Sequence, residues 1–298
     1  MAALDPEELA EGRLVAERYR IERVLGRGGM GVVCACVDEE GGERVAVKIL
    51  SKRRGPGTRA YRRFVREAKI ARGIDHPGVV KVHHLGFLES SQPYMVMELL
   101  EGRTLRALME PVPWLDAAVA RAVLASTLDA LAAVHACRVV HRDLKPENIF
   151  VLDLEPPRAT IKLLDFGVSR SADDPAARVT VEGHAVGTPM YMSPEQLMAA
   201  PPDARADIYS LGVTYYEMLT GELPYTCDDP ADLQEMLEAI LGSRLVPPSE
   251  RRPSLGTGHD AVVAHALAQL PAKRYRTAGA MRADLLAVAD APRGSARG

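Results

Sequence analysis

The hydrophobic pattern of the chain changes its period near residues 98–102, and this change limits the folds open to it. From Tyr19 to about Leu99, short β-branched runs bounded by glycine turns are typical of strands, and one helical pattern interrupts them at residues 59–74. Beyond Glu101-Gly102, stretches with helical spacing dominate. The sequence therefore predicts an α+β fold with two lobes, a small β-rich lobe with one main helix and a larger, mostly helical lobe.

The 298 residues are enough for two such cores. Residues 1–18 are predicted to form a charged lead-in, residues 19–100 the smaller lobe and residues 101–288 the larger lobe. Residues 289–298, rich in Pro, Gly, Arg and Ser, are predicted to be a linker-like tail.

Charge and cysteine content narrow the class of protein. The net charge of -3 argues against a nucleic-acid partner, which usually needs a strongly basic chain. The four cysteines form no CxxC pair and are too few for a disulfide scaffold, which favours a reducing cytoplasm. No membrane segment is predicted, because charged residues interrupt the most apolar stretch, 115–136.

A glycine-rich stretch, "LGRGGMGVV", begins at Leu25. Gly26, Gly28 and Gly31 fit the spacing G-x-G-x-x-G, which also occurs in dinucleotide-binding folds, where a helix follows the glycines. Here the strand-like run "VVCACV" follows, so the stretch predicts a hairpin whose backbone N–H groups could cover phosphates. An ordinary glycine-rich hairpin is the alternative interpretation.

Lys48 lies within the apolar strand pattern "VAVKIL". A buried lysine needs an anionic partner, and the helical pattern at 59–74 offers Glu67. Such a pair could hold the α- and β-phosphates of a nucleotide. The alternative is an edge-strand lysine that extends its amine to solvent.

Two further stretches carry carboxylates, a lysine and an amide at loop positions. "VVHRDLKPENIFVLD" contains Asp143, Lys145 and Asn148, and "LLDFGVS" places Asp165 after an apolar strand. Asn148 and Asp165 offer the oxygen ligands that Mg²⁺ prefers. Asp143 could accept a hydroxyl proton, and Lys145 could stabilise phosphoryl charge. Read alone, the first stretch could also be a polar surface turn.

Taken together and in order, these motifs resemble the eukaryotic-type protein kinase family, in the Ser/Thr branch found in bacteria. The motifs are "GRGGMGVV", "VAVK", Glu67, "HRDLKPEN", "DFG", "GTPMYMSPE" and "DIYSLGV". The resemblance extends from about Tyr19 to about Val288. It implies the bilobal protein-kinase fold and transfer of the γ-phosphoryl group of ATP to Ser/Thr hydroxyls of protein substrates. It also implies Mg²⁺ as the metal, with Mn²⁺ as an alternative.

The resemblance implies roles for individual residues. Asp143 would be the catalytic base, Lys145 and Thr188 its neighbours, and Lys48 the phosphate anchor positioned by Glu67. Asn148 and Asp165 would be the metal ligands. The implied nucleotide-binding residues are Leu25, Gly26, Arg27, Gly28, Gly29, Met30, Gly31, Val33, Ala46, Lys48, Met97, Glu98 and Leu100.

Two alternative functions remain open. A pseudokinase scaffold is disfavoured because no catalytic position departs from the motif. A small-molecule phosphotransferase is disfavoured by Arg142, Thr188 and the "MSPE" segment.

The resemblance also implies structural and regulatory features. Glu195 would form an ion pair with Arg274, and Asp207 would brace the catalytic loop. Thr180 is the expected autophosphorylation site, with Glu182 standing in for a second phosphate, and a homodimer would serve trans-autophosphorylation.

Arginines at two places in the sequence carry further predictions. Arg138 stands where relatives often carry glycine, so a positive φ would strain it. A band of arginines at positions 59, 62, 63 and 66 is interpreted as a solvated helix face, with contact to a phosphorylated loop or an acidic partner as the alternative.

Overall fold

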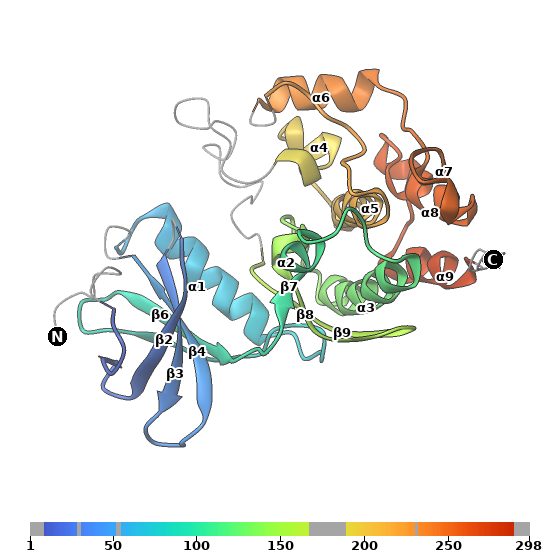
Figure 1. The fold of residues 1–298 in the computed structure, drawn as a ribbon. Coiled ribbons are helices and arrows are strands. Elements are labelled where there is room, and N and C mark those ends of the chain that lie inside the picture. Colours follow the sequence, from blue (N-terminus) through green and yellow to red (C-terminus); the bar gives the residue numbers. More distant parts are fainter. Residues whose placement is uncertain (1–8, 29–30, 52–54, 167–188, 230–231, 289–298) are drawn as a thin grey trace. The chain divides into compact units, whose positions relative to one another are not determined.

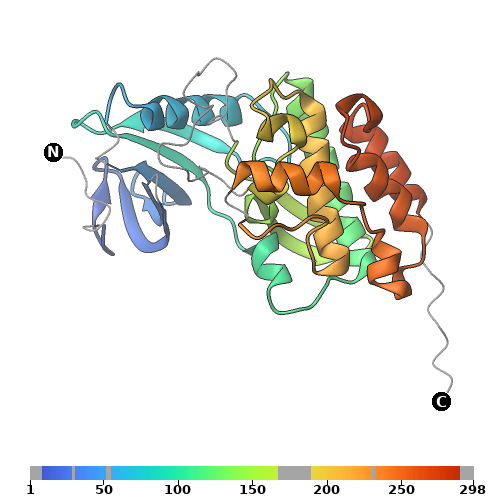
Figure 2. The same cartoon turned by 90° about the horizontal axis from the view of Figure 1, so that it is seen from above.

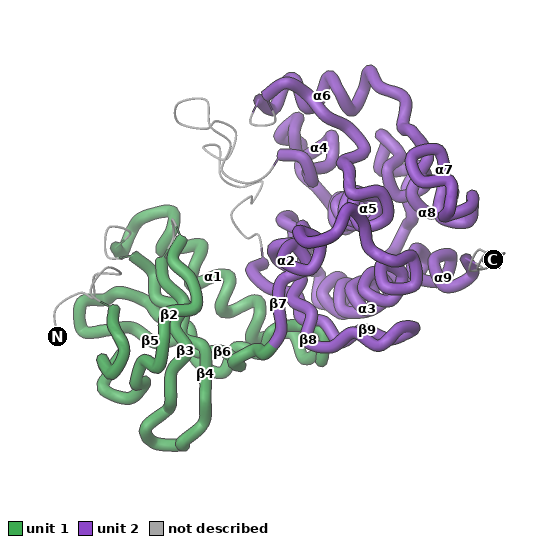
Figure 3. Tube along the Cα trace, viewed as in Figure 1, with its two compact units in different colours: residues 1–101 green, residues 102–298 purple. Residues whose placement is uncertain are grey.

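The computed structural model describes residues 9–28, 31–51, 55–166, 189–229 and 232–288. The chain divides into two compact units, residues 1–101 and 102–298, shown in two colours in Figure 3. The division falls one residue after the predicted lobe boundary at 100. Each unit is described by itself.

The first unit is built on one antiparallel sheet of six strands with the order β1-β2-β3-β4-β6-β5. Its strands are β1 Leu14–Val15, β2 Tyr19–Gly28, β3 Gly31–Asp38, β4 Arg44–Leu50, β5 Val82–Phe87 and β6 Pro93–Glu98. The helix α1, Arg59–Arg72, lies along the sheet and contacts β5 and β6 (Figures 1 and 2). The predicted strand-rich unit with one main helix is confirmed.

The two faces of this sheet carry different residues, because side chains alternate along a strand. One face forms a buried hydrophobic cluster that includes Cys34 and Cys36 of β3 and Val45, Val47 and Ile49 of β4. The other face carries the alternate residues of β3 and β4, and Lys48 is among them.

Residues 9–18, predicted to be a lead-in, contribute to this unit. Leu14–Val15 pairs with β2 as an edge strand, and the side chains of Leu9 and Val15 are buried in the hydrophobic cluster. A strand of two residues is too short to show an alternating pattern in the sequence.

α1 begins at the N-cap Thr58, whose side chain accepts a hydrogen bond from the Tyr61 N–H at 3.2 Å. Its buried side chains, at intervals of three or four residues, are Ala60, Phe64, Ala68 and Ala71. The helix predicted at residues 59–74 is confirmed over Arg59–Arg72, and its remaining face carries arginines.

The second unit contains a three-stranded sheet, β7 Arg103–Thr104, β8 Ile149–Glu155 and β9 Arg158–Leu163, and a set of helices. The helices are α2 Leu105–Met109, α3 Ala117–Ala136, α4 Pro194–Leu197, α5 Ala204–Thr220, α6 Leu233–Gly242, α7 Pro248–Arg251, α8 Gly258–Ala266 and α9 Ala278–Ala287. α3 packs against β8, β9, α5 and α9, while α6 contacts the short α4 (Figure 1).

α5 is the buried helix of this unit, and every residue from Ala206 to Thr220 is buried. The Asp203 side chain caps its first turn, and Gly221 ends it with φ 75°. A Cβ at Gly221 would lie 1.7 Å from the carbonyl oxygen of Pro113, so the chain passes too closely there for any side chain.

Within the described part of the chain, α3 is the one helix that has the length and apolar composition of a membrane span. Of its apolar window, 56% is buried inside the structure. The helix packs against β9 and α9 of the same unit.

Candidate active site

The first unit places several of the predicted nucleotide-binding residues on one face of its sheet. Lys48 lies opposite Val33 on β3 and opposite Met95 on β6, and Ala46 lies opposite Met97. Residues paired across antiparallel strands share a face. Val33, Ala46, Lys48 and Met97 therefore lie on the face opposite the hydrophobic cluster.

Lys48 is paired with Glu67 of α1. Its Nζ lies 2.9 Å from Glu67 Oε1, and the two side chains are only 14% and 13% exposed. Two charged groups that are buried to this extent must form an ion pair, because either one alone would lose its hydration without compensation. The predicted ion pair is confirmed, and the interpretation of Lys48 as a solvent-directed lysine is wrong.

The glycine-rich stretch joins β2 directly to β3, with Gly28 opposite Gly31 and Gly26 opposite Val33. No helix follows the glycines, so the stretch is a hairpin and not a dinucleotide-binding turn. A Cβ at Gly31 would lie 1.9 Å from the Ile49 carbonyl oxygen, so β4 passes too closely for a side chain. Leu25, Arg27 and Gly28 are exposed near the tip of the hairpin.

Two further predicted nucleotide-binding residues, Glu98 and Leu100, follow at the end of β6. Glu98 is the last residue of the strand, and its carboxylate accepts a hydrogen bond from the Lys81 N–H at 2.7 Å. Leu100 lies beyond the strand and is partly buried.

In the second unit, Asp143, Lys145 and Asn148 converge on one point. Lys145 Nζ lies 3.1 Å from Asp143 Oδ2. The Asn148 amide donates both to the Asp143 carbonyl at 2.7 Å and to Asp143 Oδ2 at 3.0 Å. The Asp143 side chain remains 30% exposed. The loop therefore presents an ionisable carboxylate held by two neighbours, and the interpretation of an unorganised surface turn is wrong.

Asp165 follows β9 at a strained backbone position, with φ 41°. The residue before it, Leu164, is fixed at both ends of its peptide. Its N–H donates to the Asn148 carbonyl at 2.9 Å, and its carbonyl oxygen lies 2.9 Å from His141 Nε2. These bonds tie the segment that carries Asp165 to the loop that carries Asn148.

Asp207 of α5 holds the backbone of this loop by hydrogen bonds. Its carboxylate is fully buried and accepts from the backbone N–H groups of His141 at 2.8 Å and Arg142 at 2.7 Å. It also lies 2.7 Å from His135 Nε2. The predicted brace is confirmed. Arg142 is held at φ 69°, a conformation that only such surrounding contacts would maintain.

His141 is buried against the Phe166 ring, with the two ring centroids 5.1 Å apart. Burial lowers the pKa of its imidazole, although Asp207 and Asp143 oppose the shift. With Nε2 donating to Leu164, the neutral ring acts as a spacer between the loop and the Asp165 segment.

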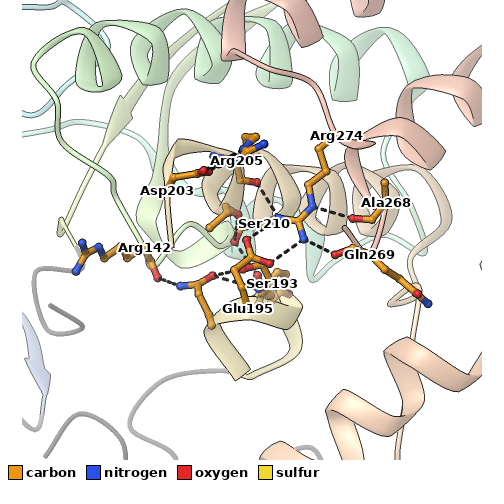
Figure 4. A network of polar contacts seen from close by, with 12 residues as sticks. Arg142, Ser193, Glu195, Asp203, Arg205, Ser210, Ala268, Gln269 and Arg274 are labelled. Atoms are coloured by element: carbon orange, nitrogen blue, oxygen red, sulfur yellow. Dashed lines mark hydrogen bonds and ion pairs between the residues drawn. The ribbon is translucent and has the colours of Figure 1, made fainter. Parts of the chain in front are cut away.

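The predicted pair of Glu195 and Arg274 is also confirmed (Figure 4). Arg274 Nη1 and Nη2 lie 2.7 and 2.8 Å from the two carboxylate oxygens, and the Arg274 side chain is fully buried. The guanidinium also donates to the carbonyl groups of Arg205, Ala268 and Gln269. All its donors therefore have partners, as a buried guanidinium requires.

A further network of ion pairs, centred on Arg106 of α2, was not predicted from the sequence. Arg106 Nε lies 3.0 Å from Glu147 Oε1, and its Nη1 lies 2.8 Å from Glu217 Oε1 on α5. The Tyr191 hydroxyl donates to Glu217 at 2.6 Å and also contacts the guanidinium. Glu147 follows Lys145 by two residues, so Arg106 ties the catalytic loop to α5.

Gln196 provides a second unforeseen contact, because its amide donates to the Arg142 carbonyl at 3.0 Å. Gln196 and Ser193 form a capping box at the start of α4. The sequence signal for this was present in "SPEQ", which fits the S-x-x-Q pattern of a helix start.

Arg138 adopts φ 58°, the left-handed conformation that the sequence analysis expected to strain it. Gly29, Met30, Thr180 and Thr188 lie outside the residues that the structure describes.

Comparisons with known proteins agree with this geometry. The family model "Protein kinase domain" matches residues 19–285. Serine/threonine-protein kinase PknB of Mycobacterium tuberculosis is 38% identical over 279 residues, which cover 92% of this chain and 43% of PknB. A probable PknB of Corynebacterium glutamicum is 35% identical, covering 91% of this chain and 42% of that protein. The chain thus spans less than half the length of these curated relatives.

Among solved structures, the kinase domain of Mycobacterium tuberculosis PknI is 27% identical, with a TM-score of 0.70, and the match covers 94% of this chain and all of that chain. A double mutant of the same domain gives a TM-score of 0.72 at 25% identity, over 94% of this chain and 98% of that one. The family match, these relatives and the geometry agree: the chain belongs to the protein kinase family and has the bilobal protein-kinase fold, with the Ser/Thr kinases of bacteria among its relatives.

Proposed function

We propose that this chain is a serine/threonine protein kinase, which transfers the γ-phosphoryl group of ATP to Ser or Thr hydroxyls of protein substrates. The observation that carries the proposal is the organised Asp143–Lys145–Asn148 loop, together with the buried Lys48–Glu67 pair. A pseudokinase scaffold would need none of these contacts.

In the proposed reaction, Asp143 accepts the proton of the substrate hydroxyl as the oxygen attacks the γ-phosphorus. The new O–P bond forms while the bond from the γ-phosphorus to the bridging oxygen breaks, and ADP leaves. Lys145, 3.1 Å from the Asp143 carboxylate, stabilises the negative charge of the transferring group. Thr188 is proposed to hold Asp143 and Lys145 in position by hydrogen bonds to both side chains.

The described residues fit a divalent metal. Both amide hydrogens of Asn148 are donated to Asp143, which leaves its Oδ1 as the atom with lone pairs for a cation. Asp165 is exposed, so an incoming cation can reach its carboxylate. Mg²⁺ held by these two groups would neutralise phosphate charge, and Mn²⁺ has the same ligand preference.

The nucleotide is proposed to bind the sheet face described above. Lys48, held by Glu67, would bind the α- and β-phosphates, and residues 25–31 would cover them. Val33 and Ala46 would contact the adenine ring, with Met97 behind it and residues 98–100 offering backbone hydrogen bonds.

We further propose autophosphorylation at Thr180 within a transient homodimer, with Arg142 receiving the phosphate. The proposed setting is the cytoplasm, which supplies ATP and keeps the four cysteines as the free thiols that they are in the structure.

The test is incorporation of phosphate from ATP and Mg²⁺ into a basic protein substrate, with Asp143→Asn as the control. Loss of the base is expected to lower kcat by about 10²- to 10⁴-fold while the fold persists. Peptide mapping should find phosphate on Thr180. Wild-type protein that phosphorylates neither itself nor the substrate would support a scaffold, and phosphorylation of small molecules alone would support the other alternative.

A further inference from the structure

The exposed face of α1 carries a row of cations. The α1 stripe consists of Arg62, Arg66, Lys69 and Arg72, spaced by four, three and three residues, so that they lie on one side of the helix. That side is opposite the buried face of the helix. Over its 14 residues α1 has six basic residues and one acidic residue, Glu67, which is paired with Lys48.

Among the described residues, no carboxylate pairs with the four cations of the α1 stripe. Two exposed arginines on the sheet of the same unit do have partners: Arg20 pairs with Glu39, and Arg44 pairs with Glu22. The α1 stripe differs from these two in that its four cations lie in one row on a helix without carboxylate partners in the described part of the chain.

Helix stability does not account for the α1 stripe. The helix dipole disfavours a cation at Arg62, in the first turn, and favours Lys69 and Arg72, in the last turn. Arg62 and Arg66, four residues apart, repel each other. The helix therefore gains no clear net stability from carrying four cations in one row.

A complementary row lies on α6 of the second unit. Residues 228–242 contain five acidic and no basic residues. The α6 stripe consists of the exposed Asp232, Glu235 and Glu238 on the side of the helix away from the buried Met236 and Ile240. These carboxylates accept hydrogen bonds from neutral groups, and the described residues offer them no cation.

Cys227 precedes α6 in the chain and lies close to these carboxylates. Burial raises the pKa of its thiol, and the carboxylates of Glu235, Asp229, Asp228 and Asp232 raise it further. The carboxylates therefore act together on a neighbouring group.

We propose that the α1 stripe of one copy of this chain binds the α6 stripe of a second copy. At 1.5 Å per residue, the Arg62–Arg72 row is about 15 Å long and the Asp232–Glu238 row is about 9 Å long, so the whole α6 stripe fits along the α1 stripe. The exposed Leu241 of α6 adds apolar area to the contact. The inference rests on the proposed self-association and names the surfaces that mediate it.

A second copy fits the charge pattern better than other anionic partners. A polyanion such as RNA would approach a chain of net charge -3, which repels it. A membrane-bound helix inserts its apolar face, and the apolar face of α1 is buried against its own sheet. Contacts between exposed charges are weak and depend on salt, as a transient enzyme–substrate encounter requires.

The test uses two double charge reversals, Arg66→Glu with Lys69→Glu on α1 and Glu235→Lys with Glu238→Lys on α6. Self-association is measured by sedimentation equilibrium without ATP, at about 50 mM and about 300 mM NaCl. Each variant alone is expected to associate at least about tenfold more weakly than the wild type at low salt, because like charges then face each other. An equimolar mixture is expected to associate again, because the two reversed rows are complementary.

The matched control is Arg23→Glu with Lys81→Glu, which reverses two exposed cations elsewhere in the first unit. It changes the net charge as much as the α1 variant does, and association should stay within about twofold of the wild type. Because no ATP is present, an inactive kinase would not affect this result.

The proposal is overturned by a wild type that remains monomeric at low salt, by a mixture that associates no better than its components, or by a control that weakens as much as the α1 variant. Vesicles of phosphatidylserine and a single-stranded DNA oligomer are assayed in parallel. Binding to either that depends on the α1 stripe, without self-association, also overturns it.

Discussion

At the scale of single residues, Arg106 lies between two carboxylates and a buried phenol. Burial and the Glu217 carboxylate raise the pKa of the Tyr191 hydroxyl well above its usual range, so it remains a donor. Arg106→Met would leave Glu217, whose side chain is 11% exposed, without its cation. We expect the free energy of unfolding to fall by about 2–4 kcal/mol, measured by urea denaturation.

The control for Arg106 is Arg205→Met, because Arg205 pairs with Asp203 in an exposed setting, with side-chain exposures of 33% and 53%. Its loss should change the free energy of unfolding by less than about 1 kcal/mol. Equal urea midpoints for Arg106→Met and the wild type would contradict a supporting role for the network.

His141 makes the free energy of unfolding of the chain depend on pH. Burial holds the pKa of the folded imidazole below its usual 6.5, so the unfolded chain binds the proton first as the pH falls. The contribution of His141 to stability is therefore complete above pH 6.5. Below that pH it is lost at up to about 1.4 kcal/mol per pH unit, until the folded pKa is reached.

His141→Gln tests this dependence, because its amide can still donate to the Leu164 carbonyl but does not titrate. Urea unfolding between pH 7.5 and pH 5 should show a shallower decline for the variant than for the wild type. The other histidines titrate in both proteins and cancel in the difference. Parallel pH profiles would show that His141 is not the group responsible.

At the scale of elements, the end of α5 fixes the loop before α3. Gly221→Ala places a Cβ against the Pro113 carbonyl at a left-handed φ. The φ alone disfavours alanine by about 1–2 kcal/mol, and the clash adds to this. We expect thermal unfolding to show a loss of at least that size.

Gly242, the last residue of α6, is the matched control, because a Cβ there meets nothing within 4 Å. Gly242→Ala should be neutral or stabilising by up to about 1 kcal/mol. If both substitutions had the same effect, the close approach at Gly221 would not limit the residue there.

At the scale of the whole molecule, the chain has two units with separate cores, and Arg274 belongs to the second. Arg274→Met leaves the Glu195 carboxylate buried without a cation, which should cost about 3–5 kcal/mol. Hydrogen exchange should show α5, α8 and α9 losing protection while the sheet of the first unit keeps it.

Arg282→Met is the comparison for Arg274, because Arg282 and Asp129 are both largely exposed and 3.8 Å apart. It should leave exchange in both units nearly unchanged. Loss of protection in both units with Arg274→Met would mean that the chain unfolds as one cooperative body.

Much of the site was predictable because its residues are close in sequence or belong to a recognisable motif. Asp143, Lys145 and Asn148 lie within six residues, so a single loop brings them together. The partners of Asp207 and Arg274 are distant in sequence, and the family resemblance supplied them. Glu67 was inferred as the partner of Lys48 because a buried lysine needs an anion. The metal-binding and nucleotide-binding roles remain predictions until they are measured.

By itself, the sequence determined the change from strands to helices near residue 101, the buried face of α1 and the hairpin at the glycines. These features follow from local periodicity and turn chemistry. Only the tertiary structure decided that Leu9 and Val15 enter the core, that Arg106 meets Glu217 111 residues away, and that Arg142 adopts a left-handed backbone. Such contacts depend on how the elements pack, and no local spacing in the sequence specifies that packing.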